Sequence, residues 1–207
     1  MKSEVYIKDG MTRGGRLIKN SADIFLAAVF MILSTPLWII IYIAIKKEDN
    51  GPVLYKQERI GKFGRPFYIL KFRSMKIDAE QNGPRLYKAG VDERMTKVGK
   101  FLREHHLDEL PQLINVLKGD MSFVGPRPER QYYIEKIMEI DDRYPCLYQV
   151  KPGVTSYATL YHGYCDTVEK MVKRLRVDLL YIRRRSLWTD IKIAFATVFR
   201  VSRGTKF

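Results

Sequence analysis

Cysteine and histidine are scarce in this sequence of 207 residues, which contains two cysteines and three histidines. Cys146 and Cys165 are too few for a disulfide framework and do not have the spacing of metal ligands. We therefore expect both to be packed thiols in a reducing compartment. The sequence also has neither internal repeats nor low-complexity tracts. A chain of this length then has room for one domain with a core, plus an appendage.

Acidic residues are in the minority, because 23 Asp and Glu stand against 37 Lys and Arg, which gives a formal net charge of +14. Such an excess indicates a polyanionic partner: nucleic acid, an anionic membrane face or a phosphorylated substrate. The fractions of hydrophobic residues, 46%, and charged residues, 29%, exclude a disordered chain and a membrane protein with many spans.

Only one long apolar run is present, residues 24–45, which contains 22 residues and no charge. It is long enough to span a bilayer. It is too long for a signal peptide and no small-residue cleavage site follows it. The positive-inside rule gives no orientation, because basic residues flank both ends of the run. These residues are Arg13, Arg16, Lys19, Lys46 and Lys47.

Pro36 lies near the middle of the apolar run, where it removes a helical hydrogen bond and bends the axis. Ser34 and Thr35 offer hydroxyls to the carbonyls that Pro36 leaves without partners. The residues alone leave two alternatives open, a re-entrant hairpin that enters and leaves on one face, and a kinked spanning helix. Asp23, before the run, is expected to pair with a basic side chain at the membrane interface.

The remaining sequence predicts a mixed, helix-rich α/β fold of the α+β type, with one compact domain and a membrane appendage. We expect a basic lead and the apolar membrane segment over 1–47, and one domain with amphipathic C-terminal helices over 48–207. Within it the patterns predict a β-hairpin over 53–75 connected at 62–64, a polar surface loop over 78–93, helices over 98–105, 112–118 and 130–144, an extended stretch over 151–163, and a helical tail over 167–201.

The segment "HHLDELPQL" places two adjacent carboxylates, Asp108 and Glu109, in a basic chain. A helix start is the simpler interpretation, because acids favour the positive end of a helix and Pro is tolerated in its first turn. The alternative is a catalytic pair. His105 and His106 are expected to be structural or solvent-facing.

Basic residues in the β-hairpin alternate with apolar ones. Lys71 and Arg73 are expected on one strand face, opposite Leu70 and Phe72. Such a face is either simply solvated or binds an anion.

The segment "GPRPE" holds Arg127 between Pro126 and Pro128, which restrict the backbone on either side. A stiffened loop of this kind suits bidentate capture of a phosphate. An ion pair between Arg127 and Glu129 that only fixes the loop is the alternative.

The tail "YIRRRSLWTDIKIAFATVFRVSR" sets Trp and Phe among Arg and Lys. This pattern is typical of a helix that lies in the membrane interface. An amphipathic core helix with a basic outer face is the alternative, and the nearby apolar run favours the interface.

Four segments in this order carry a resemblance to a known family: "YKQERIGKFGRPFYILKFRSM", "DERMTKVGKFLREHHLDELPQLINVLKGDMSFVGPRPE", "VKPGVTSYA" and "DLLYIRRRSLWTDIKI". The sequence resembles the bacterial sugar transferases, the small monotopic polyprenyl-phosphate phosphoglycosyl transferases. The likeness covers about residues 16–200. The spacing between "LDELPQL" and "GDMSFVGPRPE" is specific to it.

The resemblance implies a Mg²⁺-dependent transfer of a sugar phosphate from a UDP-sugar to a polyprenyl (undecaprenyl) phosphate, with release of UMP. Such transfers initiate the synthesis of cell-surface polysaccharides. Asp108 is then the nucleophile that forms an aspartyl-phosphosugar intermediate, and Glu109 shares the metal site or orients Asp108. Residues implied in substrate binding are Arg59, Lys71, Arg73, Arg103, Arg127 and Pro128.

The resemblance also favours the re-entrant hairpin, with its break at Thr35-Pro36 where relatives have a Ser-Pro pair. It implies a monotopic protein on the cytoplasmic face of the bacterial inner membrane, is compatible with a homodimer, and does not imply a nucleic-acid partner. The stretch 161–166 departs from many relatives because it contains no Arg. Tyr157, Tyr161 and His162 are candidates to line that side of the site instead.

Two rival functions stay open. A membrane-tethered module that binds nucleic acid or anionic lipid fits the net charge, although the basic residues form no single recognition helix. A pyrophosphatase that acts on polyprenyl diphosphates needs a further base to activate water, and the sequence shows no strong candidate.

Overall fold

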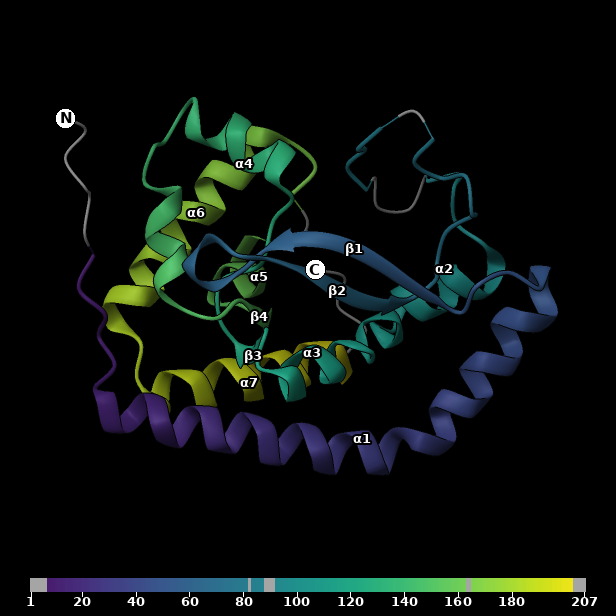
Figure 1. The fold of residues 1–207 in the computed structure, drawn as a ribbon, viewed down its shortest axis with the longest axis horizontal. Helices are drawn as coiled ribbons and strands as arrows, with labels where there is room; N and C mark the ends of the chain where they lie inside the picture. The colour runs from purple at the N-terminus through teal and green to yellow at the C-terminus, as the bar shows by residue number, and fades with distance from the viewer. Residues whose placement is uncertain (1–6, 82, 88–91, 163–164, 203–207) are drawn as a thin grey trace.

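The computed structural model describes residues 7–81, 83–87, 92–162 and 165–202. Figure 1 shows a long helix, α1, along one edge of the molecule, with a β-hairpin and the remaining helices on one side of it. The described residues form two small sheets, β1–β2 and β3–β4. A mixed, helix-rich α/β domain was predicted, and the structure confirms it.

Helix α1 spans Arg13–Asp49 and includes the whole apolar run. The Thr12 side chain caps its start by accepting from the Gly15 N–H at 3.1 Å. The helix ends at Asn50, which adopts a left-handed conformation. By length and composition α1 could cross a membrane. Only 11% of its most apolar 18-residue stretch is buried within the protein. Part of the basic lead expected before the apolar run is therefore helical, since Arg13 already begins α1.

Pro36 lies inside α1 without ending it. Figure 1 shows that α1 is bent along its length. Ser34 and Thr35 both donate their hydroxyls to the Met31 carbonyl, at 3.3 and 3.0 Å. The carbonyl that loses its helical partner to Pro36 is that of Ile32, one residue later, so the hydroxyls support the turn beside the proline.

The first sheet is the predicted hairpin. Strands β1 (Leu54–Ile60) and β2 (Pro66–Phe72) pair antiparallel, with Leu54 opposite Phe72 and Ile60 opposite Pro66. The short 3-10 helix Lys62–Gly64 (η1) connects them. Trp38 of α1 packs edge to face on Phe72, with ring centroids 5.1 Å apart, and this contact docks the hairpin on α1.

The next elements lead to the acidic pair. Helix α2 (Lys97–Glu104) is followed by the 3-10 helix Leu107–Glu109 (η2) and helix α3 (Gln112–Lys118). Gly119 ends α3 in a left-handed conformation, so the helix has the predicted extent, 112–118. Buried Asn115 of α3 accepts from the Leu70 N–H and donates to the Tyr68 carbonyl of β2, at 3.0 and 2.7 Å. These bonds fix the register of α3 against the hairpin.

The second sheet is parallel and small. Strand β3 (Ser122–Val124) pairs with β4 (Gly153–Thr155), and Ser122 lies opposite Gly153. The main core lies behind this sheet, between helix α4 (Gln131–Met138), the 3-10 helix Tyr144–Gln149 (η3), and helix α6 (Val168–Arg184).

Two predicted elements are wrong in extent. The helix expected over 130–144 ends at Met138, because the Asp141 carboxylate accepts from the Arg143 N–H at 3.2 Å and forms a turn. The stretch expected to be extended over 151–163 contains helix α5 (Tyr157–His162). Ser156 caps α5, since its hydroxyl accepts from the Thr159 N–H at 2.9 Å.

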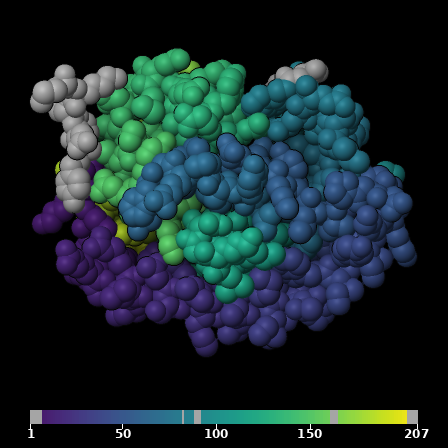
Figure 2. All heavy atoms as spheres, in the orientation of Figure 1, coloured from purple at the N-terminus to yellow at the C-terminus, as the bar shows by residue number. Residues whose placement is uncertain are grey.

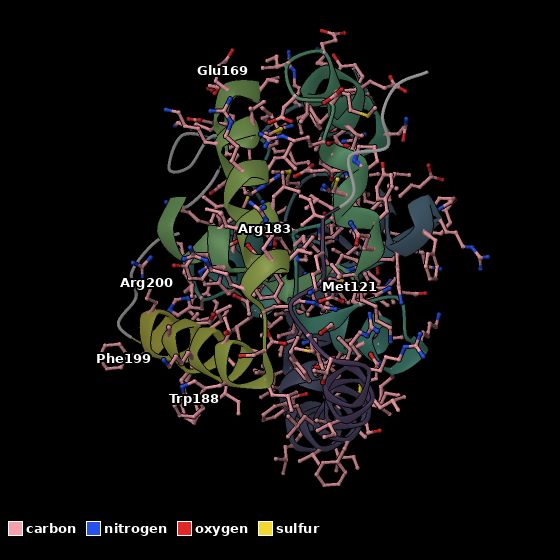
Figure 3. The ribbon with its side chains drawn as sticks, turned by 90° about the vertical axis from the view of Figure 1, so that its left-hand side faces the viewer. Met121, Glu169, Arg183, Trp188, Phe199 and Arg200 are labelled. Atoms are coloured by element: carbon pink, nitrogen blue, oxygen red, sulfur yellow. The ribbon has the colours of Figure 1, made fainter. Side chains whose placement is uncertain are left out.

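The tail forms two helices, α6 and α7 (Leu187–Ser202). One face of α6 belongs to the core, and its Leu175 and Ile182 are fully buried. Helix α7 lies beside α1, and the Lys19 ammonium lies 2.7 Å from the Asp190 carboxylate of α7. Figure 3 shows Trp188 and Phe199 of α7 pointing away from the body of the molecule.

Figure 2 shows α1 forming one continuous edge of the face in view, with the hairpin and the segment after α2 above it. Apolar side chains of α1 are exposed along this edge, including Phe25, Ile32 and Ile40 at 67, 73 and 64%. An exposed apolar surface of this kind needs a cover other than water.

Candidate active site

The acidic pair lies in the turn between α2 and α3. His106 adopts a left-handed conformation with φ 55°, which ends α2 and starts the 3-10 turn that carries Asp108 and Glu109. Pro111 precedes α3 directly. Asp108 is only 2% exposed. The pair therefore lies in the first turn of a 3-10 helix directly before α3, which agrees with the helix start that the simpler interpretation proposed.

Glu109 forms ion pairs with two basic side chains. Its Oε1 accepts from Lys71 Nζ of β2 at 2.6 Å and from Arg127 Nη2 at 3.0 Å. These residues lie 38 and 18 positions away in the sequence. The alternative in which Arg127 pairs with Glu129 is not what the structure shows. Arg127 instead pairs with Glu109, so its guanidinium lies at the acidic pair, where it could also bind a phosphate.

Asp108 has a more distant cation, since Arg103 Nη1 of α2 lies 3.8 Å from its Oδ2. The Arg103 guanidinium also stacks on the Tyr87 ring, with 4.2 Å between its Cζ and the ring centroid. Gly99 lets α2 approach the chain that follows β2, because a Cβ atom there would lie 2.0 Å from the Ser74 carbonyl oxygen.

The two carboxyl groups differ in their pKa. Burial raises the pKa of Asp108 above its ordinary value, and the charges of Lys71 and Arg103 offset this only in part. Burial acts in the same direction on Glu109, but Lys71 and Arg127 outweigh it and hold the pKa of Glu109 well below its ordinary value. Glu109 is therefore the ionised partner of the cations, and Asp108 is the more basic carboxylate.

Arg73 and Arg59 are held by other groups. The Arg73 guanidinium makes a bidentate ion pair with Asp49 at the end of α1 and donates to the Pro52 carbonyl at 2.7 Å. Its role is then to tie α1 to β2, although it also borders the cavity described below.

Arg59 Nη1 donates to the Pro128 carbonyl at 3.1 Å and to Glu129 Oε2 at 2.9 Å. Glu129 also accepts from Arg174 of α6. Burial alone would raise the pKa of Glu129. The charges of Arg174 and Arg59 outweigh this effect, so the pKa of Glu129 lies below its ordinary value. This buried cluster fixes the loop that carries Arg127. Arg174 was missed in the sequence, because one Arg on a core helix gives no local signal.

A cavity of about 760 Å³ joins these groups. One part of its wall is polar and includes Glu109, and the other part is apolar and includes side chains of α1. The polar lining residues include Arg59, Lys71, Arg73, Arg103, His106, Glu109 and Arg127, and the apolar ones include Phe30, Leu33, Leu110, Leu113, Phe123 and Val154. Asp108, which precedes Glu109 in the chain, is buried and is not among the lining residues.

The two histidines separate in the structure. His105 is exposed and stacks on Phe101, which fits the expected structural role. His106 lies on the cavity wall, and burial lowers its pKa. On the side where the sequence lacks Arg, Thr155 and Thr159 line the cavity. Tyr157 is not a lining residue, and the side chains of Tyr161 and His162 lie outside the described part.

Comparison with known proteins decides the family. The family model described as "Bacterial sugar transferase" matches residues 14–204. The chain belongs to the bacterial sugar transferase family. The matched range includes α1, the acidic turn, the Arg127 loop and α7, so the sequence resemblance is confirmed over nearly the whole chain.

Several sugar transferases resemble this chain closely. A UDP-glucose:undecaprenyl-phosphate glucose-1-phosphate transferase of Escherichia coli is 46% identical over 187 residues, which are 89% of this chain and 40% of that protein. A Caulobacter vibrioides protein of the same name is 43% identical over 189 residues, 88% of this chain and 68% of that protein. The chain thus spans about two fifths of the Escherichia coli relative.

A third relative is named for a different sugar. The UDP-N-acetylgalactosamine-undecaprenyl-phosphate N-acetylgalactosaminephosphotransferase of Aeromonas hydrophila is 40% identical over 187 residues, 90% of this chain and 44% of that protein. Membership in a sugar transferase family favours an enzyme over a nucleic-acid-binding module.

The two carboxylates of the acidic pair are of the ligand type that Mg²⁺ prefers. Among the described residues, no three His, Cys, Asp or Glu side chains come together as a metal site. Mg²⁺ is often bound by only one or two carboxylates, with substrate phosphates and water as its other ligands. Both ion pairs of Glu109 use Oε1. The other oxygen, with the adjacent Asp108, fits such a partial ligand set.

Proposed function

We propose that this chain moves a sugar phosphate from a UDP-sugar to a polyprenyl phosphate such as undecaprenyl phosphate, releasing UMP, and so initiates a cell-surface polysaccharide. The observation that carries the proposal is the convergence of Glu109, Lys71 and Arg127 on one cavity that extends to α1. Relatives at 40–46% identity are named for this class of transfer, which supports it.

The two parts of the cavity wall suit the two substrates. The basic part, around Lys71 and Arg127, suits a diphosphate, because guanidinium groups bind phosphate oxygens with charge-assisted hydrogen bonds. The apolar part includes Phe30 and Leu33 of α1 and suits an isoprenoid chain. An acceptor phosphate can then meet the donor without leaving the membrane surface.

In the first step, a carboxylate oxygen of Asp108 attacks the β-phosphorus of the donor. The bond from that phosphorus to the bridging oxygen breaks, UMP leaves with that oxygen, and an aspartyl-phosphosugar remains. Asp108 suits this role because its more basic carboxylate is the better nucleophile, and Glu109 is already occupied by two cations. Since Asp108 is buried, the turn 107–109 must move when the donor binds.

In the second step, a phosphate oxygen of the polyprenyl phosphate attacks the same phosphorus and releases Asp108. The product is a polyprenyl diphosphate sugar. In both steps an anion attacks an anion, so Lys71, Arg103 and Arg127 lower the barrier by neutralising charge on the phosphoryl group. Glu109 holds Lys71 and Arg127 in place between turnovers.

Mg²⁺ is the cofactor that this proposal includes, with Asp108 and Glu109 as its protein ligands. When bound, it would neutralise phosphate oxygens of the donor.

The proposal places the protein on the cytoplasmic face of the bacterial inner membrane, with α1 as a re-entrant helix. Support comes from the bend of α1 and from its position along one edge of the catalytic domain. The exposed Trp188, Phe195 and Phe199 of α7, at 64, 74 and 55%, suit the same membrane surface. A homodimer is part of the proposal, and the mass of the purified protein in detergent tests it.

The test is to incubate membranes containing the protein with polyprenyl phosphate and a panel of UDP-sugars, and to measure UMP release. We expect release with at least one sugar, dependent on both the acceptor and Mg²⁺. Absence of release with every sugar, in a preparation where the protein is folded and membrane-bound, would contradict the proposal.

A further inference from the structure

The membrane helix contacts the active-site loops through one buried carboxylate, that of Asp23. This residue is 7% exposed and lies immediately before the apolar run. Its Oδ2 accepts from the Ser122 hydroxyl of β3 at 2.7 Å, and its Oδ1 accepts from the Phe123 N–H at 3.4 Å. The basic partner expected from the sequence is Lys19, whose ammonium lies 3.8 Å away. The closest partner is therefore not a cation but the strand before the Arg127 loop.

Strand β3 runs directly into the loop that presents Arg127. The Gly125 N–H donates to the Thr155 carbonyl at 3.0 Å, and the Gly153 N–H donates to the Pro126 carbonyl at 2.9 Å. A Cβ atom at Gly125 would lie 2.5 Å from the Lys151 carbonyl oxygen, so the two backbones approach closely. Between Ser122 and Arg127 the chain is hydrogen-bonded to β4 and leaves little freedom for the loop to move alone.

The same face of α1 also supports the acidic turn. Ala27, one turn after Asp23, is fully buried in a cluster with Leu113 and Val116 of α3 and with Met121. Helix α3 begins three residues after Glu109. Figure 3 shows Met121 in the interior, on the side of the domain that faces α1. Both halves of the active site, the acidic turn and the Arg127 loop, thus rest on one turn of α1.

We propose that Asp23 is a positioning residue, which holds β3 against the membrane helix and so sets the place of Arg127 relative to Glu109. The membrane helix is then part of the active-site framework as well as an anchor. The effect on catalysis rests on the proposed function, whereas the effect on the loop does not.

Removing Asp23 is a usable test because its neighbours keep other partners. The Ser122 hydroxyl lies 3.0 Å from the Val124 carbonyl and can donate there instead. Lys19 keeps its ion pair with Asp190 at 2.7 Å. The Asp23→Ala variant therefore leaves no buried cation alone, and we expect it to fold and to reach the membrane.

The experiment is a double-mutant cycle between Asp23→Ala and Arg127→Lys, with kcat/KM for the donor measured in membranes. Asp23→Ala alone is expected to lower kcat/KM about ten- to a hundredfold, the effect of a small misplacement of a phosphate-binding group. In the Arg127→Lys background, Asp23→Ala is expected to lower kcat/KM less than about twofold, because the guanidinium that Asp23 helps to position is absent. Asp23→Asn, which keeps an oxygen acceptor for Ser122, is expected to restore most of the loss.

Asp9→Asn is the control, because its amide oxygen keeps an acceptor for the buried Arg185 guanidinium. Asp9 anchors the chain before α1 to Arg185, at 2.7 and 2.6 Å, away from the Arg127 loop. Its effect is expected to be the same with Arg127 and with Lys at position 127. Equal losses from Asp23→Ala in both backgrounds would show a general structural role and would overturn the proposal.

Amide hydrogen exchange tests the inference independently of activity. In Asp23→Ala, faster exchange is expected over 122–129, with exchange in α4 unchanged. Unchanged exchange over 122–129 would overturn the inference even if the enzyme is a transferase. Conversely, faster exchange in a chain that releases no UMP would support the coupling and contradict only the proposed function.

Discussion

The Lys71 ammonium lies 2.6 Å from Glu109 Oε1, and this ion pair joins strand β2 to the turn between α2 and α3. It brings together two residues that the sequence separates by 38 positions. Because Arg127 donates to the same oxygen, the Glu109 carboxylate pairs with two of the basic residues that line the cavity.

Replacement of Asp108 tests the nucleophile. We expect Asp108→Asn to lower transfer by at least about a thousandfold, because an amide oxygen does not attack phosphorus. Membrane association is expected to stay intact, since α1 is unchanged. UMP release and sedimentation with membranes are the two measurements. Substantial remaining turnover would contradict the assignment of Asp108.

Replacement of Glu109 tests the ion pairs. Glu109→Gln leaves Lys71 and Arg127 near each other without their carboxylate, so we expect the free energy of unfolding to fall by about 3 kcal/mol. The control is Glu80→Gln. It removes a more exposed partner of Arg130 and is expected to cost about 1 kcal/mol or less. Denaturant titrations in detergent measure both changes, and equal losses would contradict the prediction.

Asp178 predicts how stability depends on pH. It is buried in α6, and burial raises its pKa from 3.8 to about 7, against the opposing charge of Arg174. At a pH between these two pKa values, Asp178 keeps its proton in the folded protein and has lost it in the unfolded chain. Stability therefore falls as pH rises from about 4 to about 7, and then levels off.

The measurement is the melting temperature of the wild-type protein and of Asp178→Asn between pH 5 and pH 8. The wild type is expected to lose several degrees up to pH 7, whereas the variant, which has no proton to lose at this position, loses less. Parallel curves for the two proteins would show that Asp178 does not titrate in this range.

The topology of α1 is tested by labelling. With Cys146 and Cys165 replaced by Ser, a single cysteine is introduced as Val5→Cys, before α1. If α1 is re-entrant, a membrane-impermeant thiol reagent labels it only from the cytoplasmic side. Labelling from the outside would favour the kinked spanning helix that the residues alone left open.

Local patterns predicted the local structure well. The hairpin β1–β2 follows from strand alternation around a tight connection, and the end of α3 follows from Gly119. Helix α5 was missed because its start depends on the cap that the Ser156 hydroxyl provides. In the sequence, Ser156 lies in a segment that was predicted to be extended. The early end of α4 likewise depends on one side-chain turn, at Asp141.

The site needed more than local patterns. The acidic pair and the rigid Arg127 loop stand out in the sequence, but their contact with Lys71 is a product of tertiary packing. The sequence predicted the same role for Arg73 as for Lys71, two residues earlier. In the structure, the Arg73 guanidinium instead forms an ion pair with Asp49 at the end of α1. No spacing rule relates residues 24 positions apart on two different elements.

The central claim is that the Asp108 carboxylate carries the sugar phosphate between donor and acceptor. The most direct measurement is to incubate the protein with its UDP-sugar alone, quench and digest it, and weigh the peptide that contains position 108. The account predicts a mass increase equal to one sugar phosphate, which is absent in Asp108→Asn and disappears when polyprenyl phosphate is added. Product formation with no adduct on that peptide at any time would contradict it.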